Sequence, residues 1–127
     1  MKRVVGIGGI FFKAKDPDTL RAWYQKHLGM EPEAYGSVLF QCPESEAERQ
    51  TAQTVWNLFP SDTKYFEPSS APFMINYRVE NLEELLSQLE SEGVAVQRSE
   101  NYDYGKFGWI MDPEGNRIEL WEPDVPA

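Results

Sequence analysis

The chain has 127 residues, a length typical of one domain with a single core. Its 21 acidic and 12 basic residues give a net charge of −9, which argues against nucleic-acid and anionic-membrane partners because both require clustered cations. Cys42 is the only cysteine, which excludes an intrachain disulfide and a cysteine-rich zinc site. We expect an inert thiol at this position and a cytoplasmic protein.

Residues 4–13 (VVGIGGIFFK) are apolar and partly β-branched, which predicts a buried strand. Their glycines partly match a nucleotide-binding glycine loop, but Phe11 occupies the position at which that motif needs its third glycine. A helix follows, since Asp16 can cap its free amides and Gly29 suits its C-terminal end. His27, the only histidine, lies in the last turn, where we expect packing rather than catalysis.

The remainder of the first half predicts three strands. Two short ones lie near residues 30–34 and 37–41, and a third over residues 54–59 (TVWNLF) ends at Pro60. Residues 61–72 then form a long connection with prolines at its ends and middle.

The second half repeats this plan. Residues 73–79 (FMINYRV) predict a strand, and Asn81 begins a helix with a leucine stripe that ends at Gly93. A strand over residues 94–96 and a hairpin over residues 109–123 (WIMDPEGNRIELWEP) complete it. Each half therefore reads strand, helix and three strands, which is an internal repeat of about 60 residues.

This repeat predicts one α+β domain of two βαβββ modules. Module one covers about residues 1–60, a linker about 61–72 and module two about 73–127. Two half-sheets, each backed by a helix, can turn their free faces toward each other. We therefore expect a curved, barrel-like mixed sheet with the helices on the outside and a space within.

The last strand of the hairpin carries the strongest candidate side chain. Alternation puts Ile118 and Leu120 under a helix and turns Glu119 and Trp121 toward the enclosed space. A buried carboxylate is costly unless it is paired. Glu119 is therefore either a ligand-facing acid or one half of a structural ion pair with a nearby arginine, Arg78 or Arg117.

At this point the chain resembles the vicinal oxygen chelate superfamily, which includes glyoxalase I, bleomycin-resistance proteins and extradiol dioxygenases. The stretches that carry the resemblance are KDPDTLRAWYQKHLGM, VENLEELLSQLESEGV and DPEGNRIELWEP. It implies two βαβββ modules around a cleft, usually assembled as homodimers. In the metal-dependent members each module supplies two ligands to a divalent ion, one from its first strand and one from its last.

Carried over residue by residue, the ligand positions fall at Gly9, Asn57, Met74 and Glu119. Glycine offers no ligand, and a thioether and a neutral amide suit these metals poorly. We therefore expect no metal or other cofactor, with a divalent ion at Glu119 as the alternative. The absent side chain at Gly9 is expected to leave room for a ligand.

Residues on the same strand faces give a cleft lining of aromatic, thioether and amide side chains, which is typical of small-molecule sites. They are Phe11, Asn57, Phe59, Met74, Asn76, Trp109 and Trp121. Residues 101–108 form a glycine-containing loop whose Tyr102, Tyr104 and Lys106 can flank this cleft. The apolar members can equally fill a collapsed core.

Three functions remain open. The first is metal-independent binding of a small aromatic or cationic molecule. The second is a lyase, isomerase or dioxygenase-type enzyme in which Glu119 is the catalytic base or a metal contact. The third is a structural or regulatory dimer module whose core is filled. An open pocket beside Glu119 would count against the third.

Overall fold

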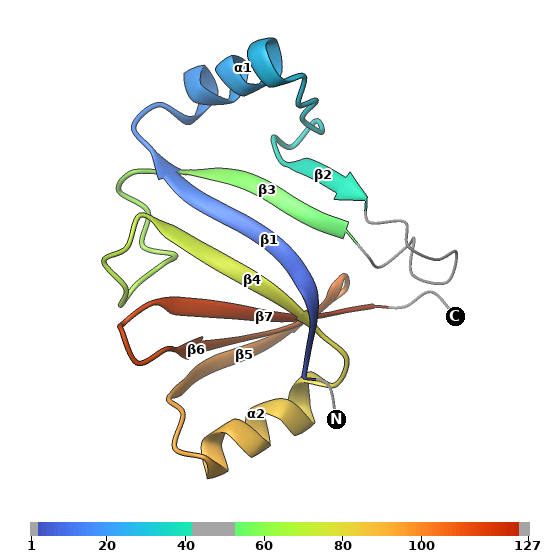
Figure 1. Cartoon of the computed structure of the whole chain (residues 1–127), viewed down its shortest axis with the longest axis vertical. Helices are drawn as coiled ribbons and strands as arrows, with labels where there is room; N and C mark the ends of the chain where they lie inside the picture. Colours follow the sequence, from blue (N-terminus) through green and yellow to red (C-terminus); the bar gives the residue numbers. More distant parts are fainter. Residues whose placement is uncertain (1–2, 42–52, 125–127) are drawn as a thin grey trace.

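The computed structural model describes residues 3–41 and 53–124. In this part of the chain, one curved seven-stranded mixed sheet carries two helices on its outer side (Figure 1). The strands are β1 (Val4–Ala14), β2 (Val38–Gln41), β3 (Gln53–Pro60), β4 (Phe73–Val79), β5 (Val96–Tyr102), β6 (Gly105–Met111) and β7 (Arg117–Pro123). The helices are α1 (Pro17–Leu28) and α2 (Leu82–Ser91). This is the α+β fold that the sequence predicts.

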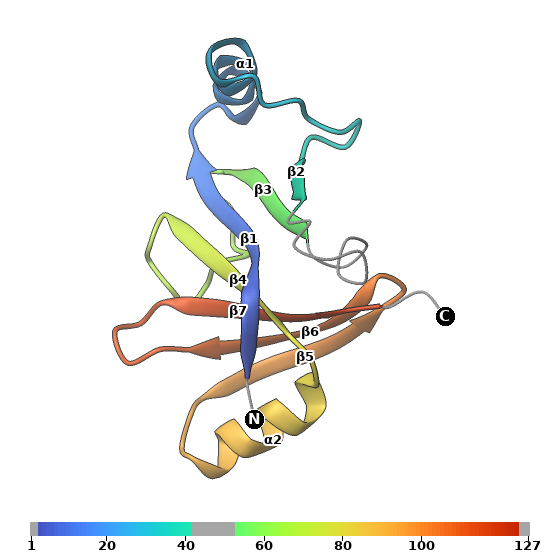
Figure 2. The ribbon, with the colours of Figure 1, turned by 45° about the vertical axis from the view of Figure 1, so that its right-hand side comes forward.

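The strand order β2-β3-β1-β4-β7-β6-β5 puts the first strand of each half at the centre. Strands β1 and β4 pair antiparallel with each other, while β3 and β7 pair parallel on either side. The register between β1 and β4 shifts between Val4 and Gly6 and again between Ile7 and Gly9. Figures 1 and 2 show α1 and α2 at opposite ends of the long axis, one for each half of the sheet.

Both helices begin as the sequence predicts. The Asp16 carboxylate accepts a hydrogen bond from the Thr19 amide at 3.1 Å, and the Asn81 side chain accepts one from the Glu84 amide at 3.3 Å. Helix α1 ends at Gly29, whose φ of 68° lies in the left-handed region. These caps fix where each helix starts to cover its half of the sheet.

The expected strand over residues 30–34 is wrong. The Glu33 amide bonds the Ser37 carbonyl at 2.8 Å, and the Gly36 amide bonds the Glu33 carbonyl at 2.8 Å, which makes a tight turn. Gly36 has a φ of 99°, which favours that turn over extended backbone. The described part of the first half therefore has two strands after its helix, β2 and β3.

The second half differs from expectation at β5. The strand starts at Val96 rather than residue 94, because the Val94 amide bonds the Leu89 carbonyl at 2.9 Å and extends the helix end. It continues to Tyr102, which pairs with Gly105 of β6. Residues 101–108, expected as a loop, are therefore the end of a β-hairpin: residues 101–102 and 105–108 belong to its two strands, and residues 103–104 form its turn.

Two apolar clusters lie between the sheet and its helices, and a third lies on the opposite, concave face. On the α2 side, Leu82, Leu85 and Leu86 pack against Leu120, as predicted for the face of β7 that carries Ile118 and Leu120. The concave cluster consists of Phe11, Phe66, Met74 and Trp109. Phe66 comes from the connection between β3 and β4, so this connection folds back onto the concave face.

Two predictions concern other parts of the chain. Cys42 lies outside the described residues. Neither helix in the described ranges combines the length and the apolar character that a membrane span requires.

Candidate functional site

Two adjacent rows of side chains cross the concave face of the sheet. Strand register aligns the members of one row as Gly9, Asn76, Glu119 and Trp109, and those of the next as Asn57, Phe11 and Met74. The structure thus brings together most of the residues that the sequence singled out. Phe59 lies farther along β3 and packs against the same cluster.

Glu119 is 2% exposed and is held by three neutral donors. The Asn76 amide donates to Oε1 at 2.6 Å, and the Trp109 indole N–H donates to Oε2 at 2.9 Å. The Tyr65 hydroxyl also donates to Oε2. Such charge-assisted bonds replace the water that a buried carboxylate loses.

The ion pair with Arg78 or Arg117, one of the two alternatives for Glu119, is absent from the described residues. Arg78 donates instead to the carbonyls of Ile7 and Gln53, the latter at 3.1 Å. The Arg117 Nε donates to the Gln97 side chain at 3.2 Å, and its Nη1 donates to a backbone carbonyl. Hydrogen bonds from neutral donors, rather than an ion pair with a cation, therefore offset the desolvation cost of burying Glu119.

Tyr65 is the site residue that the sequence did not reveal. Its ring stacks on Phe59 with centroids 5.4 Å apart and planes 5° apart, and meets Trp109 edge-on. The Arg117 guanidinium lies 5.8 Å from the centre of the ring and donates to the Tyr65 carbonyl. The residue is nonetheless 38% exposed. It therefore covers Glu119 from the solvent side.

Burial, together with the negative charge of Glu119, raises the pKa of the Tyr65 hydroxyl well above its usual value. The hydroxyl thus stays protonated at neutral pH and serves as a donor to the carboxylate. The one hint of this role in the sequence is the aromatic pair Tyr65-Phe66 in an otherwise polar, proline-bounded connection. Apolar side chains in such a connection need a surface to cover.

The space expected at Gly9 is filled. A Cβ atom at this position would lie 2.7 Å from Cζ of Phe11 and 3.2 Å from Cβ of Asn76. Phe11 folds its ring over the glycine, while Met74 and Phe66 are fully buried beside it. The prediction that Gly9 leaves room for a ligand is therefore wrong, because a neighbouring side chain on the same strand occupies that room.

The remaining predicted residues extend the aromatic surface. Trp121 stacks on Phe107 with centroids 5.9 Å apart, and Phe107 stacks on Trp109. At the hairpin tip, the exposed rings of Tyr102 and Tyr104 stack on each other and meet Phe107 edge-on. These rings extend the aromatic surface that starts at Trp109. Lys106 instead reaches Glu83 on α2, at 3.4 Å.

Four buried side-chain polar atoms lack a hydrogen-bond partner among the described residues. Two of them are Oδ1 of Asn76 and Nε1 of Trp121, and the other two belong to Arg21 and Gln88. Asn76 is 2% exposed, and its Oδ1 faces the backbone of Gly8. Unpaired atoms of this kind are uncommon in folded cores. The unpaired atoms of Asn76 and Trp121 lie on the same concave face as Glu119.

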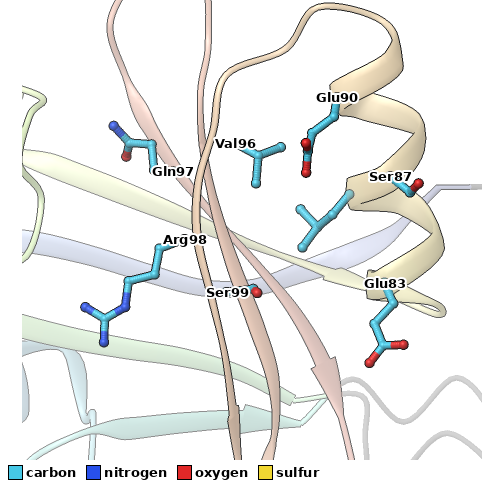
Figure 3. A pocket seen from close by; sticks show the side chains of 8 residues that line it. Glu83, Ser87, Glu90, Val96, Gln97, Arg98 and Ser99 are labelled. Atoms are coloured by element: carbon cyan, nitrogen blue, oxygen red, sulfur yellow. The ribbon is translucent and has the colours of Figure 1, made fainter.

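A separate open hollow of about 580 Å³ lies between α2 and β5 (Figure 3). Its lining combines Leu86 and Val96 with acidic, hydroxyl and amide side chains and Arg98. None of the residues predicted to line the cleft contributes to it. The hollow lies against the helix, whereas Glu119 faces the concave side.

The residues at the family's ligand positions do not fit a divalent metal ion. Asn57 and Glu119 occupy equivalent positions in the two halves. Asn57 of β3 pairs with Phe11 of β1, and Glu119 of β7 pairs with Asn76 of β4. Both oxygens of Glu119 already accept from N–H or O–H groups. No group of three or more His, Cys, Asp or Glu side chains in the described ranges is arranged to hold a metal.

Comparison with known families identifies the superfamily to which this chain belongs. Residues 6–120 match the family model of the Glyoxalase/Bleomycin resistance protein/Dioxygenase superfamily. The chain belongs to this superfamily. Its membership confirms the resemblance stated from the three sequence stretches. A search of curated proteins finds no match.

Three solved structures are similar to this superfamily member at low sequence identity. Methylmalonyl-CoA epimerase from Mycobacterium tuberculosis is 24% identical, with a TM-score of 0.64 over 98% of this chain and 91% of that one. A glyoxalase/bleomycin resistance protein/dioxygenase superfamily member from Vibrio splendidus is 12% identical, with a TM-score of 0.57 over 91% and 97%. The 2,3-dioxygenase LapB from Pseudomonas sp. KL28 is 17% identical, with a TM-score of 0.62 over 97% and 42%. At these identities the likeness concerns the fold alone.

Proposed function

We propose that this superfamily member binds a small aromatic molecule on its concave face, without a metal ion, in the place that the Tyr65 ring occupies. The observation that carries the proposal is the way Tyr65 is held. Its ring lies between aromatic side chains and its hydroxyl reaches a buried acid, yet the residue is 38% exposed and belongs to a connection. A free aromatic molecule can make the same contacts.

Displacement of Tyr65 requires little rearrangement elsewhere. The next residue, Phe66, is fully buried and can hold the connection in place while the tyrosine turns outward. The displacement loses a hydrogen bond to a charged group, the stack on Phe59, the edge-on contact with Trp109 and the ring contact with Arg117, on the order of 3–6 kcal/mol together. The open state would then be a minor one, populated at about 0.004–0.6%, and available to a ligand.

The same displacement supports the second candidate function. Oε2 of Glu119 accepts from Tyr65 and Trp109 in the closed arrangement, so a substrate can reach it only after Tyr65 leaves. A lyase or isomerase with Glu119 as its base would therefore use the same cleft. It requires a turnover that Glu119→Gln abolishes, whereas a binding protein shows none.

The test is an NMR titration of the full chain with phenol, p-cresol, indole and benzoate. The reporter is the indole N–H signal of Trp109, which donates to Glu119 at 2.9 Å. The indole of Trp23, which is 51% exposed on α1, is the internal control. We expect at least one aromatic compound to shift the Trp109 signal and leave Trp23 unchanged.

Variants sharpen the test. Tyr65→Ala removes the internal competitor and should strengthen binding at least ~10-fold. The matched control is Tyr35→Ala, because Tyr35 is 71% exposed and lies in the connection between α1 and β2. If no aromatic compound shifts the Trp109 signal in the wild type or in Tyr65→Ala, the proposed function is wrong.

A further inference from the structure

We infer that the molecule that replaces Tyr65 is a hydroxyaryl carboxylate: an aromatic ring with a hydroxyl group at one end and a carboxylate at the other. This inference rests on the function proposed above and specifies its ligand. It follows from the two polar ends of Tyr65, which meet groups of opposite character.

The hydroxyl end is set by Glu119. A carboxylate only accepts hydrogen bonds, and its two neighbours Asn76 and Trp109 already donate to it. The third position, taken by the Tyr65 hydroxyl, therefore calls for another donor. A phenol satisfies this requirement, whereas an ether, a ketone or a second carboxylate leaves Glu119 facing an acceptor.

The opposite end is set by Arg117. Its guanidinium lies 5.3 Å from the centre of the Trp109 ring and 5.8 Å from that of Tyr65, and it donates to the Tyr65 carbonyl. Among the described residues it has no carboxylate within ion-pair distance. Its Nε and Nη1 donate to Gln97 and to this carbonyl, whereas its Nη2 has no acceptor among the described residues. A ligand carboxylate at Nη2 would give the cation an anionic partner.

A cationic ligand, which the sequence left open, is disfavoured by the positive side chains near the concave aromatic cluster. Besides Arg117, the Arg98 guanidinium lies 5.8 Å from the centre of the Trp109 ring, and the Lys13 ammonium lies 5.7 Å from that of Phe66. Arg98 is already paired with Glu100 at 2.5 Å. Three cations thus approach the aromatic cluster of a chain whose net charge is −9. Of these three, Arg117 is the cation with which the ligand carboxylate would form an ion pair.

The experiment compares four probes that share one benzene ring by calorimetric titration of the full chain. They are 4-hydroxyphenylacetate with both groups, p-cresol with the hydroxyl alone, phenylacetate with the carboxylate alone, and tyramine with a hydroxyl and an ammonium. We expect 4-hydroxyphenylacetate to bind at least ~10-fold more tightly than p-cresol or phenylacetate, and tyramine to bind weakest. The same order is expected in Tyr65→Ala, with all affinities raised.

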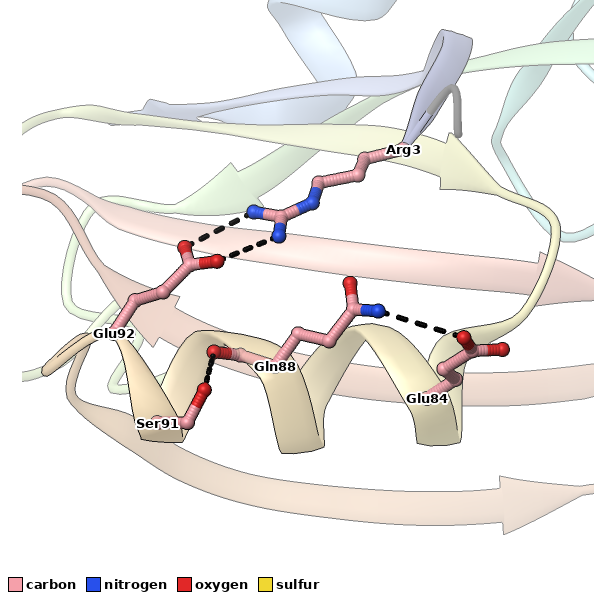
Figure 4. Close-up of polar contacts among 5 residues, drawn as sticks. All are labelled: Arg3, Glu84, Gln88, Ser91 and Glu92. Carbon is pink, nitrogen blue, oxygen red and sulfur yellow. Dashed lines mark hydrogen bonds and ion pairs between the residues drawn. The ribbon is translucent and has the colours of Figure 1, made fainter.

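Arginine variants identify the carboxylate partner. Arg117→Gln should erase the advantage of 4-hydroxyphenylacetate over p-cresol while p-cresol itself still binds. The matched control is Arg3→Gln, since Arg3 pairs with Glu92 at 2.6 Å beside α2, away from the concave face (Figure 4). It should leave every affinity unchanged.

The two proposals fail separately. Binding of p-cresol or tyramine at least as tight as that of 4-hydroxyphenylacetate overturns the ligand class and leaves aromatic binding intact. Absence of binding by all four probes overturns both. If circular dichroism shows that Tyr65→Ala is unfolded, the order of affinities in the wild-type chain decides the matter alone.

Discussion

The Tyr65 hydroxyl donates a hydrogen bond to the buried carboxylate of Glu119, although 54 positions separate the two residues. Tyr65 belongs to the connection between the two halves, and Glu119 to the last strand of the second. The bond therefore ties the connection to the floor of the concave face. It also makes the carboxylate inaccessible while the tyrosine is in place.

Removal of this hydroxyl should destabilise the fold. Tyr65→Phe keeps the ring on Phe59 but leaves Glu119 with two donors instead of three, so we expect the free energy of unfolding to fall by about 1–3 kcal/mol. Urea unfolding followed by circular dichroism measures this. Tyr35→Phe, at a tyrosine that is 71% exposed, should change it by less than about 0.5 kcal/mol. Equal stabilities of the two variants would show that the bond contributes nothing.

Alkaline pH should weaken the same bond. The folded protein raises the pKa of Tyr65, so its contribution is complete below the unfolded value of 10.0 and is lost as pH climbs above it. In that range the unfolded chain releases the proton while the folded chain retains it, and stability falls. Urea midpoints between pH 8.5 and 11 should drop more steeply for the wild type than for Tyr65→Phe. Parallel curves would contradict the assignment.

Substitution of the acid itself should be costlier. Glu119→Gln removes the charge and replaces one acceptor oxygen with an NH₂ donor, so the bonds from Asn76, Trp109 and Tyr65 cannot all be kept as they are. We expect a loss of about 2–4 kcal/mol. Thermal and urea unfolding give the value. Glu90→Gln, on the exposed side of α2, is the matched surface change and should be nearly neutral.

A side chain at Gly9 should conflict with Phe11. Gly9→Ala places a Cβ 2.7 Å from the Phe11 ring, and we expect a loss of about 1–3 kcal/mol. Phe11→Leu shortens the opposing side chain, so the double variant should recover part of this loss. A double-mutant cycle measures that recovery. Strict additivity of the two changes would mean that the ring does not occupy the glycine's space.

The sequence predicted the second half of the fold well because its signals are local. The turn at residues 112–116 and the strict alternation over residues 117–121 place Ile118 and Leu120 under α2, and the structure agrees. The first half was harder. Residues 30–34 have a strand-like composition beside a turn, and the hydrogen bonds of Glu33 close the turn instead.

The candidate site shows the same division. Glu119 and its strand neighbours follow from period-2 geometry, which any strand obeys. Tyr65 could not be placed, because the path of a connection depends on contacts that form only in the folded chain. The filling of Gly9 depends on the rotamer of Phe11, and no strand pattern specifies a rotamer.

The two register shifts in β1 bear on ligand size. Each inserts extra backbone on one side of the central strand pair, and such bulges bend and twist a sheet. Phe59 of one half and Trp109 of the other both contact a single phenol ring, that of Tyr65. We therefore expect the curvature of the central strand pair, beside the row that holds Asn76 and Glu119, to limit the width of the site. A relative with the same lining and an unbulged first strand would admit broader molecules than one benzene ring.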